Sequence, residues 1–123
     1  MHDGPYISLV TFRRDGSEVA TPVWFAPLGD KLYVFTDGTS YKVKRLRRDD
    51  RIRIAPCGVA GALEGDWISG RGRVVEDRDL VAQAYRALGA KYGWQMSAIN
   101  FLSRLSGRIK RRVILELDID APS

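Results

Sequence analysis

The stretch TDGTSYKVKRLRRDDR, residues 36–51, holds the side chains of this sequence that are best suited to binding an anion. Its cations are Lys42, Lys44, Arg45, Arg47, Arg48 and Arg51. The main negative charges near them are those of Asp49 and Asp50. The apolar spacing predicts a short helix over residues 40–48. Such a helix can bind a small polyanion, bind a nucleic acid, or simply present a charged face to the solvent.

The first turn of this predicted helix is suited to a phosphate. Ser40 can cap the helix with its hydroxyl, and the first backbone N–H groups of a helix have no intrahelical partner. These N–H groups, the positive end of the helix dipole and the Lys42 ammonium together favour a bound phosphate. The later cations Arg45, Arg47 and Arg48 are more typical of a solvated face, because they spread around the exposed side of the helix.

Length and composition limit what the chain can be. With 123 residues, 45% hydrophobic and 28% charged, it is predicted to form one globular domain over residues 1–123. A single cysteine, Cys57, and a single histidine, His2, exclude an intrachain disulfide framework, a cysteine-based metal cluster and a histidine-dependent triad. The sequence shows neither a signal-peptide pattern nor about 20 consecutive apolar residues, which favours a cytoplasmic protein without a membrane partner.

The net charge of +5 favours an anionic partner of some kind. Nucleic acid is disfavoured, because the sequence has no helix-turn-helix pattern, no zinc-finger spacing and no aromatic ribonucleoprotein strand motif. Only one aromatic residue, Tyr41, lies within the basic stretch, which does not make a stacking pattern for successive bases.

Most of the chain is predicted to form short strands separated by turns. Two turn-forming pairs, Asp15-Gly16 and Gly29-Asp30, divide residues 6–36 into three consecutive antiparallel strands. Three further strands are predicted over residues 51–56, 65–77 and 113–119. Within the fifth strand, Gly70 and Gly72 predict a bulge or a close approach of something else to the backbone.

Three helices are predicted beside these strands: residues 40–48 with Val43 and Leu46 facing the core, residues 80–88 capped by Asp79 and ended by Gly89, and residues 94–105 followed by Gly107. Tyr92, Trp94 and Met96, at the start of the last helix, either form a lid over a binding site or pack against the strands. Six strands with peripheral helices predict a mainly β protein, a small antiparallel β-barrel, and a sandwich is the competing arrangement.

Four segments, taken in order, resemble one family: TPVWF, LYVFT, SYKVKRLRRDDRIRIAPC and GDWISGRGRVVED. They are similar to the deazaflavin-dependent branch of the pyridoxamine-5′-phosphate oxidase-like superfamily, whose members are split β-barrels that use coenzyme F420. The resemblance covers roughly residues 5–119. It implies a six-stranded antiparallel split β-barrel that forms a homodimer, with a flavin-like cofactor in each of two grooves at the subunit interface.

The resemblance also implies which positions contact the cofactor. Those beside the tricyclic ring, its ribityl region or its edge would be Pro22, Val23, Trp24, Thr36, Pro56 and Cys57. Those at the phosphate, or in the basic wall that continues from it, would be Ser40, Lys42, Lys44 and Arg45. Tyr41 stands where flavin mononucleotide members commonly carry an arginine, which disfavours tight binding of that mononucleotide. From the residues alone, Cys57 is better interpreted as a small buried side chain than as a redox centre.

The implied reaction is hydride transfer between coenzyme F420 and a small electron-poor acceptor, such as a conjugated C=C or C=N bond. The proton donor to the product would be Tyr41, Tyr92 or water. The residues that bind the vitamin B6 substrate in the true oxidases are not recognisable, so that chemistry is disfavoured. Two alternatives stay open: a non-catalytic carrier of coenzyme F420, and a flavin mononucleotide (FMN) protein of the same fold.

Overall fold

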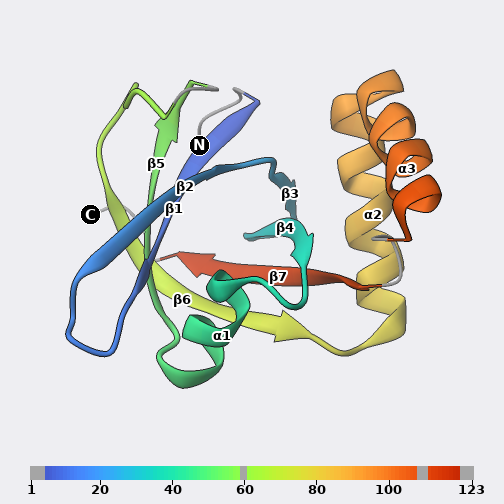
Figure 1. Cartoon of the computed structure of the whole chain (residues 1–123). Helices are drawn as coiled ribbons and strands as arrows, with labels where there is room; N and C mark the ends of the chain where they lie inside the picture. Colours follow the sequence, from blue (N-terminus) through green and yellow to red (C-terminus); the bar gives the residue numbers. More distant parts are fainter. Residues whose placement is uncertain (1–4, 59–60, 108–110, 120–123) are drawn as a thin grey trace.

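The computed structural model describes residues 5–58, 61–107 and 111–119. These residues form one curled antiparallel sheet of seven strands, with one helix packed against the barrel core and two helices on the outer face (Figure 1). The order across the sheet is β2-β1-β5-β6-β7-β4-β3. The strands are β1 (Tyr6–Phe12), β2 (Glu18–Val23), β3 (Ala26–Leu28), β4 (Lys31–Asp37), β5 (Arg51–Cys57), β6 (Ile68–Val75) and β7 (Arg112–Ile119).

The sheet has to curl, because its two outermost strands are neighbours in the chain. β2 and β3 stand at opposite ends of the strand order, yet only Trp24 and Phe25 separate them. Six inter-strand spacings would put the edges of a flat sheet roughly 29 Å apart, whereas three Cα steps reach about 11 Å at most. The two edges therefore come together, and the predicted barrel is confirmed over the competing sandwich.

The prediction of six strands was wrong by one, because the second predicted strand divides at Trp24 and Phe25. Before the division β2 pairs with β1, and after it β3 pairs with β4. Phe25 is fully buried at the point where the chain changes partners. The segment PVWFAP contains neither a glycine nor a charged residue that would indicate this change.

The barrel core is filled from the inward faces of the strands and from one helix. The two-residue alternation of β5 places Ile52 and Ile54 inside, as the sequence predicts. Helix α1 (Tyr41–Arg48) packs against β1 and β6 and contributes Val43 and Leu46, also as predicted. The other buried members of this core are Ile7, Leu9, Val23, Phe25, Leu32, Val34, Leu115 and Leu117.

The close approach predicted at the glycines of β6 is confirmed. A Cβ atom on Gly70 would collide with the carbonyl oxygen of Asp118 and lie 2.8 Å from the Cα of Ile119, both on the neighbouring strand β7. A Cβ atom on Gly72 would lie 3.3 Å from a methyl group of Leu46 in α1. Both glycines therefore serve packing within this chain.

Helix α2 (Arg78–Tyr92) begins two residues earlier than predicted. Asp77 caps it, because its carboxylate accepts hydrogen bonds from the backbone N–H groups of Asp79 and Leu80, at 2.9 and 3.4 Å. The prediction that Asp79 is the cap was wrong. Asp79 instead supplies the negative charge in the first turn, where the helix dipole favours it.

The prediction that Gly89 ends this helix was also wrong. Gly89 stays helical, at a cost of about 1 kcal/mol relative to alanine, because the extra turn buries Tyr92. The chain breaks instead at Gly93, whose φ of 57° suits glycine, and α3 (Trp94–Ser106) follows directly. Gly107, with φ 75°, ends α3 in the left-handed conformation, as a helix C-terminus favours.

Helices α2 and α3 stand together on one side of the barrel (Figure 1). Their contact with the outer face of the sheet is a second apolar cluster, made by Ala84, Leu88, Tyr92 and Met96 against Ala26, Tyr33, Val75 and Ile114. Among the described residues, none of the helices has the length and apolar character required to cross a membrane.

Candidate functional site

A hydrogen-bonded turn positions the start of α1. The carboxylate of Asp37 accepts hydrogen bonds from the backbone N–H of Thr39 at 2.8 Å and from its hydroxyl at 2.7 Å. The backbone N–H of Ser40 donates to the Asp37 carbonyl at 3.0 Å. Gly38 donates its N–H to the Arg111 carbonyl at 2.6 Å, which ties the turn to the residue before β7. This turn fixes Ser40 as the residue immediately before the helix.

Ser40 occupies the predicted cap position but makes no side-chain cap bond. Its hydroxyl oxygen is buried and has no hydrogen-bond partner among the described residues. A buried hydroxyl without a hydrogen bond destabilises a protein by roughly 1–3 kcal/mol. Such a hydroxyl is therefore expected to bond to a group that does not belong to the isolated chain. The hydroxyl could therefore bond to a ligand at the helix start once a change of rotamer exposes it.

Lys42 lies in the first turn of the same helix and is only partly exposed. Burial lowers the pKa of its ammonium group, the nearby guanidinium of Arg45 adds to the effect, and the carboxylate of Asp37 opposes it. Among the described residues no carboxylate forms an ion pair with Lys42, and the first turn contains no acidic residue. A partly buried cation at the positive end of a helix is unfavourable alone and becomes favourable when an anion binds. Ser40 and Lys42 thus fit a phosphate group.

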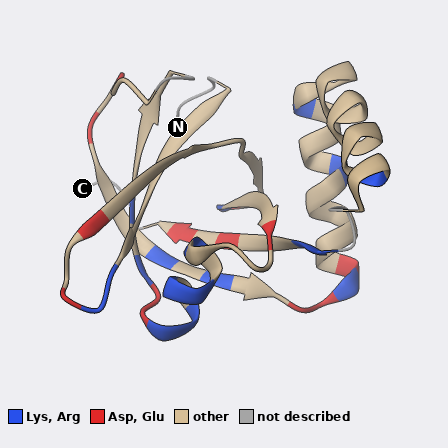
Figure 2. Cartoon of the chain, in the orientation of Figure 1, with Lys and Arg blue, Asp and Glu red and all other residues tan. Residues whose placement is uncertain are grey.

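Lysines and arginines lie along much of α1 (Figure 2), and the contacts of their side chains differ. Lys44 and Arg45 lie 5.2 and 5.7 Å from the ring centre of Tyr41, which is 72% exposed. Arg47 is exposed. Arg48 donates a 2.6 Å hydrogen bond to the Phe12 carbonyl, which anchors α1 to β1. Arg48 is exposed, as predicted for a solvated face, and this hydrogen bond is an additional role.

Four of the predicted ring-contacting residues lie on the two strands that flank β1. Ile7 in β1 pairs with Val23 of β2 on one side and with Pro56 of β5 on the other. Pro22, the residue before Val23, also pairs with β1. It lies on the outermost strand β2, where a residue without a backbone N–H is tolerated. We call Pro22, Val23, Pro56 and Cys57 the strand-end group.

Two members of the strand-end group have buried side chains. Val23 belongs to the barrel core, so only its backbone can face a ligand. Cys57 is fully buried, as predicted for a small apolar side chain. Burial raises the pKa of its thiol, and the carboxylate of Glu64 adds to this, so the thiol stays protonated and unreactive.

The other two ring-contacting residues lie at either side of Phe35. Trp24 meets Phe35 edge to face, with ring centres 6.2 Å apart. Thr36, the next residue of β4, lines an open pocket of about 330 Å³ together with Asp37 and Arg111. Thr36 lies four residues before Ser40 in the chain, close to the start of α1. We call Thr36, Ser40, Lys42, Lys44 and Arg45 the helix-start group.

The structure divides nine of the ten predicted site residues into these two groups, and Trp24 belongs to neither. Within the described residues, no hydrogen bond or ion pair joins the strand-end group to the helix-start group. The described part of the chain contains no cluster of His, Cys, Asp and Glu that could hold a metal ion.

The three residues at the start of the third predicted helix have different roles. Tyr92 and Met96 are buried and pack against the sheet, whereas Trp94 is 78% exposed. The Tyr92 hydroxyl accepts from the backbone N–H of Phe25 at 2.9 Å and can donate to the carbonyl of Pro5 at 2.7 Å. Tyr92 therefore holds the backbone together rather than facing a ligand as a proton donor.

Sequence reasoning missed a polar cluster between the helices and the sheet, formed by Tyr85, Asn100 and Arg112. One signal was present. Residues 80–115 contain no aspartate or glutamate, but they include seven lysines and arginines. Lysines and arginines in this segment can therefore form ion pairs only with carboxylates from other parts of the chain or from a ligand.

The comparison with protein families gives a match over nearly the whole chain. Residues 2–121 match the family described as pyridoxamine 5′-phosphate oxidase. The chain belongs to this family. The split β-barrel predicted from the sequence is the fold that results. No curated protein matches the sequence.

Solved structures with the same fold have diverse descriptions. A conserved hypothetical protein from Mycobacterium tuberculosis is 19% identical, with a TM-score of 0.72 over 96% of this chain and 74% of that chain. HutZ, the heme storage protein from Vibrio cholerae, is 12% identical, with a TM-score of 0.71 over 96% and 83%. An F420 reductase is 18% identical, with a TM-score of 0.62 over 97% and 90%. At these identities the likeness concerns the fold alone.

Proposed function

We propose that this split β-barrel protein binds coenzyme F420 and is an oxidoreductase that transfers a hydride between the deazaflavin and a small electron-poor organic acceptor. The observation that carries the proposal is the buried, partnerless hydroxyl of Ser40 beside the partly buried ammonium of Lys42 at the start of α1. Coenzyme F420 contains a phosphodiester and a glutamate tail, so it brings anionic groups to a helix start whose first turn contains no acidic residue. The fold likeness to an F420 reductase supports the same choice.

Each member of the helix-start group would have a distinct role. Ser40 and the first N–H groups of α1 would donate hydrogen bonds to the phosphodiester, and Lys42 would neutralise its charge. Lys44 and Arg45 would attract the glutamate carboxylates. Because exposed pairs of this kind are worth about 0–1 kcal/mol each, they would assist capture rather than determine specificity.

The ring would lie against the strand-end group and Trp24. The bound deazaflavin would supply the hydride, and the chain would orient the ring and exclude water from it. Backbone groups on the outer edge of β2 are suited to this, since β2 pairs only with β1 among the described strands. The proton donor would be water or a residue other than Tyr92.

A homodimer would bring the two groups into one groove, and exposed apolar side chains support this part of the proposal. Trp94, Phe101 and Leu105 recur on one face of α3 and are 78%, 62% and 71% exposed. Light scattering should give twice the 13.8 kDa mass of the chain. Phe101→Lys should shift the equilibrium toward the monomer. A monomeric wild-type protein would contradict the dimer.

A matched pair of variants tests the cofactor site. Lys42→Ala should weaken coenzyme F420 binding by roughly 1.5–3 kcal/mol, the range for a charge-assisted contact. Arg47→Ala removes the same charge from an exposed position of the same helix and should change affinity far less. Equal losses would show that only net charge matters and would defeat the assignment. Turnover of an acceptor then separates an enzyme from a carrier.

A further inference from the structure

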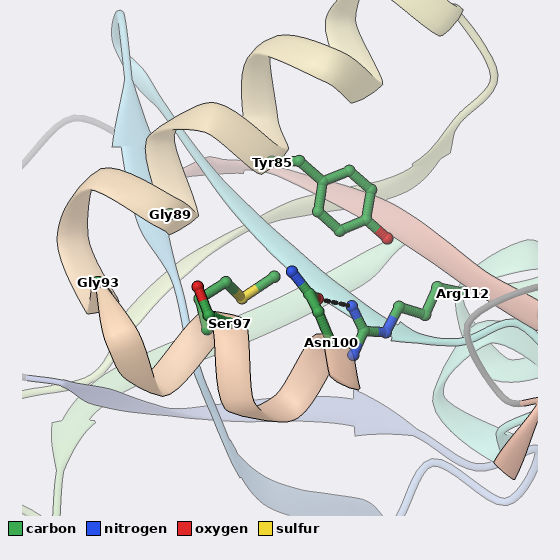
Figure 3. A pocket seen from close by; sticks show the side chains of 7 residues that line it. Tyr85, Gly89, Gly93, Ser97, Asn100 and Arg112 are labelled. Carbon is green, nitrogen blue, oxygen red and sulfur yellow. Dashed lines mark hydrogen bonds between the residues drawn. The ribbon is translucent and has the colours of Figure 1, made fainter. Parts of the chain in front are cut away.

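An open pocket lies between α2, α3 and the first residue of β7 (Figure 3). Its volume of about 600 Å³ falls in the range of small-molecule sites. Its lining residues are Tyr85, Gly89, Gly93, Met96, Ser97, Asn100 and Arg112. Arg112 also lines the smaller pocket that contains Thr36, so the two pockets are adjacent.

The guanidinium of Arg112 is fixed in place by neutral groups only. One Nη donates to the side-chain oxygen of Asn100 at 2.6 Å, and the other donates to the Ser103 hydroxyl at 2.6 Å and to the Ile99 carbonyl at 3.4 Å. Its central carbon lies 4.7 Å from the ring centre of Phe35. Arg112 also interacts with the hydroxyl of Tyr85, whose pKa it lowers against the larger effect of burial.

No carboxylate of a described residue pairs with Arg112, although its neighbour Arg111 has Asp37 at 3.6 Å. The whole lining comes from the acid-free stretch 80–115, and Arg112 is the one charged residue in it. A partly buried, immobilised cation without a counter-charge favours an anionic ligand, because the anion restores the electrostatic balance lost on burial.

The groups around Arg112 are also donors. Since the side-chain oxygen of Asn100 faces Arg112, its NH₂ group points the other way and has no partner among the described residues (Figure 3). Tyr85 extends from α2 toward Arg112 (Figure 3), and burial raises the pKa of its hydroxyl, which therefore stays protonated at neutral pH. Met96 and the Tyr85 ring supply an apolar wall.

We infer that this pocket binds the carboxylate of a small aromatic or conjugated organic acid, with Arg112 and the Asn100 NH₂ group on the carboxylate and the Tyr85 ring and Met96 against its planar part. Such an acid would be the hydride acceptor, an assignment that rests on the proposed function. Phe35 contacts both Trp24 and Arg112, so the pocket adjoins the expected ring site. The binding of a carboxylate itself does not depend on the cofactor.

The wild-type protein can be tested with benzoate and its neutral isostere benzamide. In an NMR titration near pH 7 that resolves arginine Nε–H signals, benzoate should bind at least about tenfold more tightly than benzamide. It should also shift the Arg112 signal. Equal affinities, or benzoate-induced shifts confined to the arginines of α1, would overturn the inference.

Variants separate a carboxylate site from general attraction by a basic protein. Arg112→Gln should weaken benzoate at least about tenfold and leave benzamide nearly unchanged, whereas Arg104→Gln, which removes the same charge from an exposed position of α3, should have an effect below about twofold. Asn100→Asp keeps the contact with Arg112 but neutralises it, so this variant should also lose benzoate even if Arg112→Gln does not fold. Unchanged benzoate binding by Asn100→Asp would contradict the proposal.

The coenzyme itself carries carboxylates, so a further titration distinguishes the source of the ligand. With coenzyme F420 at saturation, benzoate should still bind to the pocket with similar affinity. Competitive displacement by the coenzyme would assign the pocket to its glutamate tail and overturn the acceptor assignment. If benzoate binds and coenzyme F420 does not, the carboxylate site stands while the proposed function fails.

Discussion

The indole of Trp24 lies flat on the phenol ring of Tyr92, with ring centres 4.2 Å apart and planes inclined by 6°. Trp24 stands where the chain passes from β2 to β3, and Tyr92 is the last residue of α2. The Tyr92 hydroxyl also bonds to the backbone of Phe25, the residue after Trp24. One side chain of the helical pair therefore holds the bend that closes the barrel.

The hydroxyl of Tyr92 should contribute measurably to stability. Tyr92→Phe keeps the ring on Trp24 but leaves the buried N–H of Phe25 without this acceptor, so we expect a loss of about 1–3 kcal/mol in the free energy of unfolding. Urea unfolding would measure it. Tyr41→Phe, at an exposed ring, is the matched control and should stay within about 0.5 kcal/mol of the wild type.

A second tyrosine should make stability depend on alkaline pH. Tyr33 donates a 2.8 Å hydrogen bond to the buried carboxylate of Glu116, and burial together with this bond raises the pKa of Tyr33 from 10.0 to about 12. A raised folded pKa gives stability that is complete below the unfolded value of 10.0 and is lost as the pH rises toward about 12. The wild type should therefore lose stability over this range.

Tyr33→Phe removes the contribution of Tyr33 to that dependence, whereas Tyr92, whose pKa burial also raises to about 12, keeps its own. At pH 7 the variant should be less stable by about 1–3 kcal/mol, because Glu116 loses one of its partners. Between about pH 10 and 12 the gap to the wild type should close, as unfolding titrations at several pH values would show. A gap that stays constant across this range would mean that the hydrogen bond does not control the titration.

Two glycines should respond to alanine in opposite directions. Gly70→Ala places a Cβ against the backbone of β7 and should cost about 1–3 kcal/mol, the usual range for overpacking. Gly89→Ala has open space around the new atom in α2 and should stabilise the protein by about 0.5–1 kcal/mol. Thermal unfolding of both variants gives the comparison, and a Gly70→Ala variant as stable as the wild type would argue against the close approach at β6.

Turn residues and strand alternation were enough to predict the barrel, because the signals lie close together in the chain. Asp15-Gly16 and Gly29-Asp30 mark real turns, and both glycines have positive φ. The division at Trp24 was not predictable in this way, since it depends on Tyr92, which is 68 residues later (92 − 24). The end of α2 beyond Gly89 depends on the same contact.

The candidate site was predictable in part for the same reason. Ser40 and Lys42 lie within one helical turn, so their combination can be recognised from the sequence alone. Arg112, Asn100 and Tyr85 come from β7, α3 and α2, and only the packing of those elements brings them to one pocket. The missing carboxylates between residues 80 and 115 indicated unbalanced charge but not where it collects.

The basic wall beside the phosphate site should act on capture more than on affinity. Lys44→Ala should weaken coenzyme F420 binding by no more than about 1 kcal/mol and reduce its dependence on ionic strength, because Lys44 is exposed and its pairing with carboxylates is screened. Titrations at low and high salt would measure both. A loss as large as that expected for Lys42→Ala would place Lys44 on the phosphate itself.

The most direct test of the central claim is a fluorescence titration of the wild-type protein with coenzyme F420 and, separately, with flavin mononucleotide. We predict micromolar or tighter binding of coenzyme F420, with the mononucleotide at least about tenfold weaker. Preference for the mononucleotide would keep the fold and move the function to flavin chemistry. Binding of neither would contradict the proposed function and leave the buried Ser40 hydroxyl and Lys42 to another anion.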